Sequence, residues 1–289
     1  MIGFGVPIAF ALAAISIIVL GLADVSMLVV AQRFYRGVQS FPLVAVPLFI
    51  LAGQVMNRSG ISGHLVEFAK TLVGQIRGGL AAVNVVTSMF FAGMSGTSMS
   101  DTAAVGGILI PPMVKRGFSR AFTGAVTASS STIGIIIPPS VPMVILAAYM
   151  GVSTGALFAA GLVSGVLLAA GLILAAWIVS VRQGYPAEDK FSLTALGRAF
   201  VKAMPALIMP IIILGGILGG IFTPTEASAV AVVYGILVSA LYYRTMGLRR
   251  LYEVFVESAV LSGAVMLVTA TAHVLGYTFA YEALADTIL

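Results

Sequence analysis

Two short stretches of this sequence combine Gly, Ser and Thr inside otherwise apolar segments. The first covers residues 92–101 and reads Ala-Gly-Met-Ser-Gly-Thr-Ser-Met-Ser-Asp; the second runs from Ser129 to Gly134 and is followed by Pro138 and Pro139. Where Gly and Pro interrupt a helix, backbone carbonyls lose their partners, and these oxygens are hard ligands suited to Na⁺. The half-helix N-termini nearby offer free amides to a carboxylate. The two stretches therefore predict a site for a cation and a small acid.

Asp101 is the one acidic residue between Lys70 and Glu188. An ionisable side chain at membrane depth is a functional candidate. Asp is also a favoured helix N-cap, so Asp101 can equally cap the segment that follows it. The serines at 129–131 have a similar alternative, because they can donate to carbonyls of their own helix, but the prolines beyond them favour an ion site.

An enzymatic reading rests on Gly93-Met-Ser-Gly96, which fits the G-x-S-G pattern of intramembrane serine proteases. Ser95 would be the nucleophile and His273 its base. Four-residue Gly/Ser patterns are frequent by chance, and a protease does not explain the two adjacent prolines, so transport is favoured. The absence of Cys excludes thiolate metal sites, and two His argue against a His-rich one.

The composition identifies the surroundings of these segments. Of 289 residues, 60% are hydrophobic and 9% are charged, and the mean hydropathy is +1.11. So few charges cannot cover a water-exposed surface, which excludes a soluble globular or disordered chain. The apolar runs are long and continuous, which favours bilayer-spanning helices over a β-barrel. Basic residues cluster between these runs, so the net charge of +5 reflects membrane topology and not nucleic-acid binding.

We therefore predict an all-α polytopic membrane protein that forms a single integral membrane unit over residues 1–289. The predicted order is two spans within 1–58 (3–22 and 41–56), an amphipathic surface helix over 59–79, a hairpin over 80–113, a broken helix over 121–150, a span over 153–181, a cytoplasmic amphipathic link over 182–203, and further spans over 204–289. Within the last region, Thr223-Pro-Thr-Glu226 predicts a helix start with a capping box.

The segment 80–113 is predicted to be a re-entrant hairpin. Its apolar arms, 80–91 and 102–113, are each about 12 residues long, or roughly 18 Å as helices, against a hydrocarbon core of about 30 Å. Charge supports this topology. With the amino terminus in the cytoplasm and no crossing at the hairpin, all 15 Lys and Arg except Arg33 and Arg36 lie inside.

The chain resembles a known family at several stretches that follow one another in the family's order. These are Phe91-Ala-Gly-Met-Ser-Gly-Thr-Ser-Met-Ser-Asp-Thr-Ala-Ala-Val-Gly106 with Ile110-Pro-Pro-Met113, and the segments 41–53, 128–140 and 222–227. Together they are similar to the large, DctM-like membrane subunit of tripartite ATP-independent periplasmic (TRAP) transporters. The resemblance covers nearly the whole chain.

This resemblance implies Na⁺-driven uptake of an organic acid, such as a C4-dicarboxylate or a sialic acid, across a bacterial or archaeal cytoplasmic membrane. It implies a non-enzyme without an organic cofactor, with a periplasmic substrate-binding protein and a small four-helix membrane subunit as partners. The implied fold is an inverted-repeat, elevator-type secondary transporter. Segment 3–22 would correspond by topology to the helix after Thr223, and 41–56 to the helix after Glu257. The family's second hairpin would follow the last span, so we expect a partial chain that lacks it.

The resemblance also implies site residues. Those expected to build a first Na⁺ site are Ser95, Gly96, Thr97, Ser98, Thr132, Gly134 and Pro138, with backbone carbonyls contributing as much as hydroxyls. The substrate would bind beside them at the hairpin tip, where the candidate residues are Ser98, Asp101, Ser130 and Ser131. No metal other than Na⁺ is expected.

Overall fold

We describe the protein from a computed structural model, which covers residues 5–187 and 191–282. The regular elements of these residues are helices, 12 of them α-helices, which confirms the all-α prediction. Five segments are long and apolar enough to cross a membrane: Phe41–Arg58, Thr154–Arg182, Leu193–Leu218, Pro224–Tyr242 and Leu248–Tyr281. The described part of the chain is therefore that of a polytopic membrane protein.

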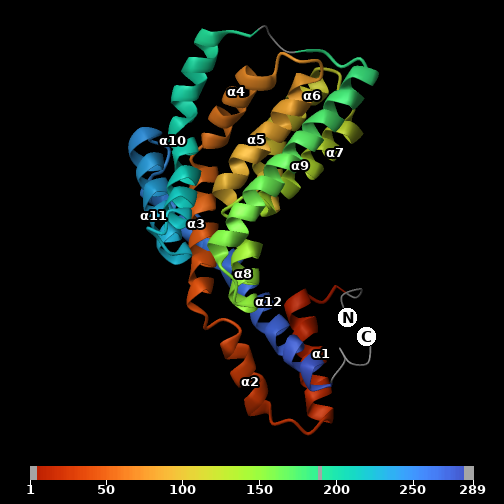
Figure 1. The fold of residues 1–289 in the computed structure, drawn as a ribbon, viewed down its shortest axis with the longest axis vertical. Helices are drawn as coiled ribbons and strands as arrows, with labels where there is room; N and C mark the ends of the chain where they lie inside the picture. Colours follow the sequence, from red (N-terminus) through yellow and green to blue (C-terminus); the bar gives the residue numbers. More distant parts are fainter. Residues whose placement is uncertain (1–4, 188–190, 283–289) are drawn as a thin grey trace.

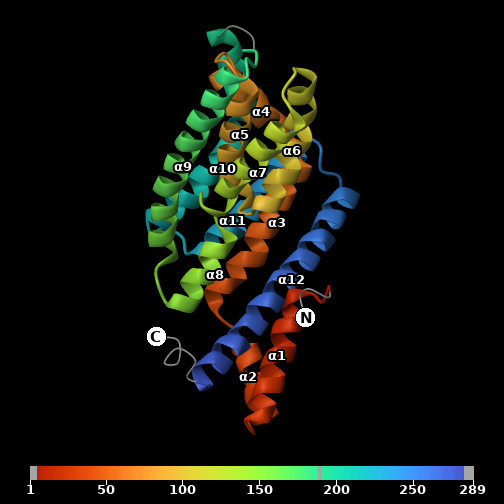
Figure 2. The same ribbon diagram turned by 90° about the vertical axis from the view of Figure 1, so that its right-hand side faces the viewer.

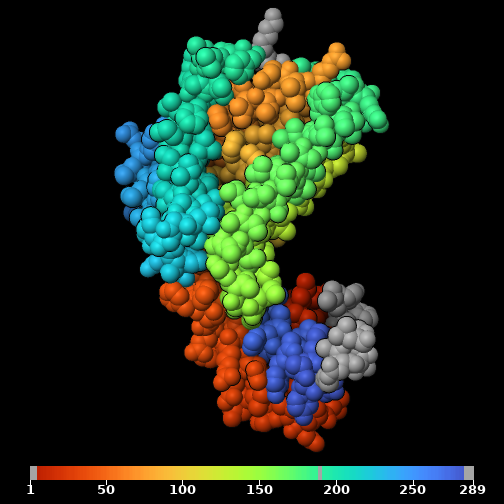
Figure 3. All heavy atoms as spheres, viewed as in Figure 1, coloured from red at the N-terminus to blue at the C-terminus, as the bar shows by residue number. Residues whose placement is uncertain are grey.

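The helices form an upper body and a lower lobe (Figures 1 and 2). The upper body contains α4 (Ile61–Val73), α5 (Gly79–Ser95), α6 (Ser98–Lys115), α7 (Arg120–Ser131), α9 (Thr154–Arg182), α10 (Leu193–Leu218) and α11 (Pro224–Leu237). The lower lobe contains α1 (Ile8–Leu22), α2 (Met27–Arg36) and the end of α12 (Leu248–Tyr281). In the space-filling view this lobe stands apart from the upper body and meets it along α3 (Ala45–Arg58) and α8 (Val141–Met150) (Figure 3).

The hairpin predicted over 80–113 is formed by α5 and α6, which pack side by side (Figure 1). Its turn is only two residues long. Gly96 ends α5 at a positive φ of 63°, which a residue with a side chain rarely adopts, and the Thr97 hydroxyl accepts from the Ser100 amide to start α6. Thr97, and not Asp101, is therefore the N-cap.

The arms are longer than the sequence predicted, with 17 residues in α5 and 18 in α6. At 1.5 Å per residue each measures about 26 Å, close to the thickness of the hydrocarbon core. The difference arises at the tip, where residues up to Ser95 and from Ser98 onward stay helical because the turn is confined to Gly96 and Thr97. Arm length alone therefore does not argue for a re-entrant hairpin.

The helix predicted over 121–150 is interrupted. Helix α7 passes into a 3₁₀ turn, Thr132–Ile135, and α8 begins only at Val141. The Ser140 hydroxyl supports both sides of the gap, because it donates to the Ile135 carbonyl (2.7 Å) and accepts from the Met143 amide (3.4 Å). The interruption thus coincides with Pro138 and Pro139, whose missing amides cannot continue the helical ladder.

Three further segments differ from their predicted forms. The link predicted over 182–203 is not a separate element, because α10 starts at Leu193 and continues through Pro205 and Pro210. The residues between the two spans predicted within 1–58, for which no element was predicted, contain a helix of their own, α2. The amphipathic helix α4 buries one face against α5 and α10, so that face does not lie on lipid.

The capping box at Thr223 is confirmed. The Thr223 amide donates to Oε2 of Glu226 (2.8 Å), and the Glu226 amide donates to the Thr223 hydroxyl (3.3 Å).

The interrupted helix packs against two glycines of α9. A Cβ atom on Gly161 would lie 2.5 Å from the Ile136 carbonyl oxygen, and one on Gly165 would clash with the Ile137 side chain. Small residues on α9 therefore let the broken segment approach closely, as is common between membrane helices.

We expect Gly161→Val to destabilise the protein by about 1–3 kcal/mol, because the new side chain must push the Ile136 backbone away. Gly171→Val on the same helix is the matched control, since a Cβ there meets nothing within 4 Å. Thermal unfolding in detergent would measure both variants. Equal unfolding temperatures for the two would show that this close contact is not needed.

Candidate functional site

The tip of the hairpin lies directly against the broken helix. The Val141 amide donates to the Gly96 carbonyl (3.3 Å), and a Cβ on Gly96 would lie 2.6 Å from the Pro139 carbonyl oxygen. On the other side of the contact, a Cβ on Gly134 would lie 3.2 Å from the Thr97 carbonyl oxygen. The two irregular segments therefore meet backbone to backbone, as their shared composition suggested.

Two full-length helices enclose the rest of the tip. A Cβ on Gly53 of α3 would lie 3.1 Å from the Ser95 carbonyl oxygen and 3.3 Å from that of Met94. From α10, the ring of Pro210 reaches the backbone at Gly93, where a Cβ would lie 2.8 Å from it. Backbone carbonyls thus line the contacts of the tip with its neighbours, and carbonyl oxygens are the ligands that discontinuous helices offer to Na⁺.

The residues predicted to bind Na⁺ are only partly gathered there. Those in or beside the contact are Ser95, Gly96, Thr97, Gly134 and Pro138, all buried except the half-buried Thr97. The half-buried Ser98 opens α6, and its carbonyl accepts the Thr102 hydroxyl (2.8 Å). Thr132 has an exposed side chain whose hydroxyl donates to the Ser129 carbonyl of its own helix (2.7 Å). Backbone oxygens are therefore better placed than these hydroxyls.

Behind the tip, a buried polar cluster joins α5 to α7. Asn84 donates through Nδ2 to the Thr127 hydroxyl (2.8 Å) and accepts from the Ser130 hydroxyl at Oδ1 (2.9 Å). The Ser88 hydroxyl donates in turn to that of Ser130 (3.1 Å), and the Ser131 hydroxyl donates to the Thr127 carbonyl (2.8 Å). Ser130 and Ser131, which the resemblance offered for substrate, thus lie in the interior. Asn84 is distinguished in the sequence as an amide side chain within an apolar arm, a signal for a buried hydrogen-bonding residue.

Asp101 is fully buried beside this cluster. Its carboxylate faces Ser88 and Ser131, but those hydroxyls donate elsewhere, and neither carboxylate oxygen has a hydrogen bond within the described residues. The hydroxyls of Thr87 and Ser100 are likewise buried without a partner there. A buried, unpaired carboxylate is costly, so this position calls for a cation or a proton.

Two cavities open on either side of the tip. One, of about 710 Å³, extends from Gly96 and Thr97 along the apolar faces of α8 and α12. The other, of about 470 Å³, is lined by Thr97 and by Arg58 and Glu257, which pair through both carboxylate oxygens (2.5 and 2.8 Å). Thr97, Val141 and Val265 line both cavities, so the two cavities adjoin beside the tip. Arg58 and Glu257 are 199 residues apart, and no local pattern predicts that they meet here.

The proposed protease pair does not form. The Ser95 hydroxyl donates to the Thr97 carbonyl (3.5 Å), and His273 stacks on Tyr149 with ring centroids 5.5 Å apart. A nucleophilic serine needs its base within hydrogen-bonding reach. Across the part of the chain that the structure describes, no cluster of His, Cys, Asp and Glu suited to a metal is found either.

We expect Asn84→Leu to lower stability by about 1–3 kcal/mol, because it removes the two hydrogen bonds that join α5 to α7 through Asn84. The hydroxyls of Thr127 and Ser130 keep only their bonds to carbonyls of α7 and the bond from Ser88. Asn57→Leu is the control, since Asn57 is half-buried beside a cavity and contributes no such cluster. A change within about 0.5 kcal/mol is expected for it. Chemical or thermal unfolding of both variants in detergent would test this; a stable Asn84→Leu variant would contradict it.

Comparison with known proteins agrees with this architecture. The family described as "Tripartite ATP-independent periplasmic transporter, DctM component" matches residues 1–288. The chain is 37% identical over 276 residues to the 2,3-diketo-L-gulonate TRAP transporter large permease protein YiaN of Escherichia coli, covering 94% of this chain and 64% of YiaN. It is 36% identical over 285 residues to the sialic acid TRAP transporter large permease protein SiaM of Vibrio cholerae, covering 98% and 67%.

A third relative is the C4-dicarboxylate TRAP transporter large permease protein DctM of Pseudomonas aeruginosa, which is 38% identical over 258 residues, covering 89% of this chain and 60% of the relative. The chain thus spans about two-thirds of the length of the curated relatives it matches.

Proposed function

The chain belongs to the DctM family of tripartite ATP-independent periplasmic transporters, and on that basis we propose that it forms part of the large permease subunit of a Na⁺-coupled importer of an organic acid. The family is a family of transport proteins and not of enzymes. The observation that carries the proposal is the backbone contact between the hairpin tip and the broken helix, with a cavity on each side of it.

The residues at this contact fit Na⁺. The carbonyl oxygens of Ser95, Thr97 and Pro139 each lie against a glycine of a neighbouring segment at this contact. The Asp101 carboxylate lies buried without a hydrogen-bond partner among the described residues. When bound, Na⁺ would supply the positive charge that this region needs. The tip amides and hydroxyls, beginning with Ser98, would then be available to the substrate carboxylate.

Helix packing supports the inverted repeat that the family resemblance implied. In the implied repeat, α1 is equivalent to α11 and α3 is equivalent to α12. A two-fold axis that exchanges the members of each pair requires that, if α1 contacts α12, α11 also contacts α3. Both contacts are present, and they are among the most extensive between helices. On this basis we propose that the hairpin and the broken helix move together against α3 and α12 in an elevator motion.

We further propose the topology that the basic residues favour, with a cytoplasmic amino terminus and a hairpin that opens to the cytoplasm. The proposed partners are a periplasmic substrate-binding protein and a small membrane subunit. Relatives are named for 2,3-diketo-L-gulonate, sialic acid and C4-dicarboxylates, and one for isethionate, a sulfonate. An anionic acid group is the feature that these substrates share, and we propose a carboxylate for this chain.

The proposal predicts Na⁺-dependent uptake. The full-length protein with its partners, reconstituted in proteoliposomes, should import one acid from a panel of succinate, N-acetylneuraminate and 2,3-diketo-L-gulonate. Replacing Na⁺ by choline at equal ionic strength should lower the initial rate at least about tenfold, within the usual range of coupling energies. Equal rates in both salts would refute the coupling, and no uptake of any acid would refute the substrate class.

A second prediction concerns Asp101. In Na⁺-free buffer Asp101→Asn should be at least as stable as the unchanged protein, because it removes an unpaired buried charge. Na⁺ should stabilise the unchanged protein by about 2.7 kcal/mol at 100 times its dissociation constant, and the variant by less than half as much. Asp24→Asn, at an exposed loop position, is the matched control and should retain the full response. An undiminished response in Asp101→Asn would separate Asp101 from the Na⁺ site.

A further inference from the structure

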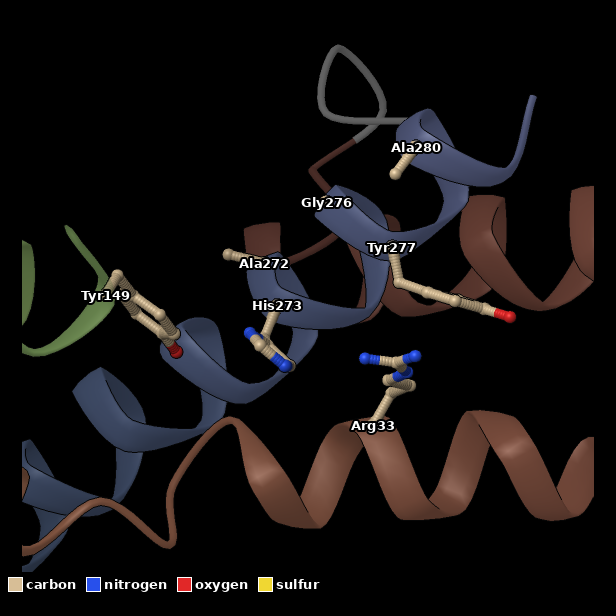
Figure 4. Close-up of a pocket in the computed structure, with 7 residues that line it drawn as sticks. All are labelled: Arg33, Tyr149, Ala272, His273, Gly276, Tyr277 and Ala280. Atoms are coloured by element: carbon tan, nitrogen blue, oxygen red, sulfur yellow. The ribbon is translucent and has the colours of Figure 1, made fainter. Parts of the chain in front are cut away.

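A third cavity lies in the lower lobe, between α2, α8 and α12, and has a volume of about 390 Å³ (Figure 4). Its polar lining consists of Arg33 from α2, Tyr149 from α8, and His273 and Tyr277 from α12. The remaining lining residues are the small Ala272, Gly276 and Ala280, which leave space for a ligand. A cavity of this size holds a small organic molecule.

The Arg33 guanidinium contacts an aromatic ring, and its N–H groups have no carboxylate partner among the described residues. Its guanidinium carbon lies 4.2 Å from the centroid of the Tyr277 ring, which is a cation–π contact. Stacking on a ring uses the face of the guanidinium and none of its N–H groups, which point outward in its plane. No carboxylate among residues 5–187 and 191–282 pairs with Arg33. In Figure 4 its side chain rises from α2 toward Tyr277 and His273.

The opposite wall is fixed. His273 stacks on Tyr149, and the Tyr149 hydroxyl donates to the Gly37 carbonyl (2.8 Å), with the Thr269 carbonyl also within reach (3.0 Å). A Cβ on Gly37 would lie 2.9 Å from that of His273, so α2 and α12 are in close contact beside the cavity. The cavity therefore combines a cation that pairs with no carboxylate among the described residues, a second nitrogen donor and aromatic walls, which suits a small carboxylate.

This cavity continues toward the hairpin. Tyr149 and Ala272 line both it and the 710 Å³ cavity, which ends at Gly96 and Thr97. The stretch between is almost entirely apolar and offers a carboxylate no other cationic side chain among the residues that line it. One end of the path thus has a positive charge, and the other has the backbone of the tip.

We propose that the cavity around Arg33 is an outer binding site, where the carboxylate of the substrate is bound before it reaches the hairpin tip. Arg33 forms the paired hydrogen bonds to the carboxylate, and His273 donates a further one. The inference rests on the proposed function, in which the charge pattern places α2 on the outer side. The favoured occupant is a small organic acid and not an acidic side chain of a partner, because the site is concave and opens into the path to the tip.

The test compares Arg33→Gln with Arg36→Gln, which alters an exposed arginine on the same helix that does not line the cavity. Both are measured in the full complex with whichever panel acid the unchanged complex imports. Arg33→Gln should raise the half-saturating substrate concentration roughly tenfold to a hundredfold, with the maximal rate at saturation nearly unchanged. Arg36→Gln should leave both unchanged. Arg33→Lys should fall between, since Lys keeps the charge but not the paired geometry.

A second measurement removes the binding protein. Direct binding of the same acid to the purified permease should weaken by the same factor in Arg33→Gln. Unchanged acid binding together with weaker assembly with a partner subunit would overturn the proposal in favour of a protein contact. Identical behaviour of the two Gln variants would overturn it as well. Failure of the unchanged complex to import any acid would instead count against the proposed function.

Discussion

The structure depends on one constraint. Backbone N–H and C=O groups that lack a helical hydrogen bond in apolar surroundings must bond to another part of the protein or to a ligand. Here the ladder fails at the hairpin turn and between α7 and α8. The two failures lie against one another, with the Val141 amide satisfied by the Gly96 carbonyl. The contact is possible only because Gly96 and Gly134 lack side chains, and because Gly161 and Gly165 admit the broken segment from behind. A carbonyl oxygen has two lone pairs, so the carbonyls at this contact can still accept from or coordinate a ligand.

The features of this arrangement that depend on residues adjacent in the sequence could be predicted. Pro138 and Pro139 cannot continue a helix, Gly96 permits a turn, and Thr223 with Glu226 forms a cap within four residues. The sequence predicts a span only from 204 onward, because 182–203 is amphipathic, whereas α10 begins at Leu193. Two prolines inside α10, Pro205 and Pro210, are accommodated by tertiary contacts. Tyr234 donates to the Pro205 carbonyl (2.7 Å), and the ring of Pro210 packs on Gly93.

The contacts that bring distant parts of the chain together could not be predicted from periodicity. Asn84 and Ser130 are 46 residues apart, and Arg58 and Glu257 are 199 apart. Nothing local distinguishes a serine that forms interior hydrogen bonds from one that faces a cavity, so the sequence alone does not separate these roles for Ser130 and Ser131. Thr132 illustrates the same limit, because its hydroxyl returns to the Ser129 carbonyl, an alternative that the sequence leaves open.

Electrostatics links the cation to the acid in the proposed function. The cationic side chain that lines a cavity at the tip is Arg58, and Glu257 already neutralises it. Asp101, buried nearby, adds negative charge to a region that would receive a carboxylate. A second anion entering there would face repulsion in addition to the cost of leaving water, unless a positive charge came with it. With no spare basic residue lining either cavity at the tip, a mobile cation is the simplest source of that charge. In the proposed function, coupling to Na⁺ would follow from the composition of the site itself. The acid would be bound well only when the cation is present, and linkage then requires that the cation is bound better with the acid.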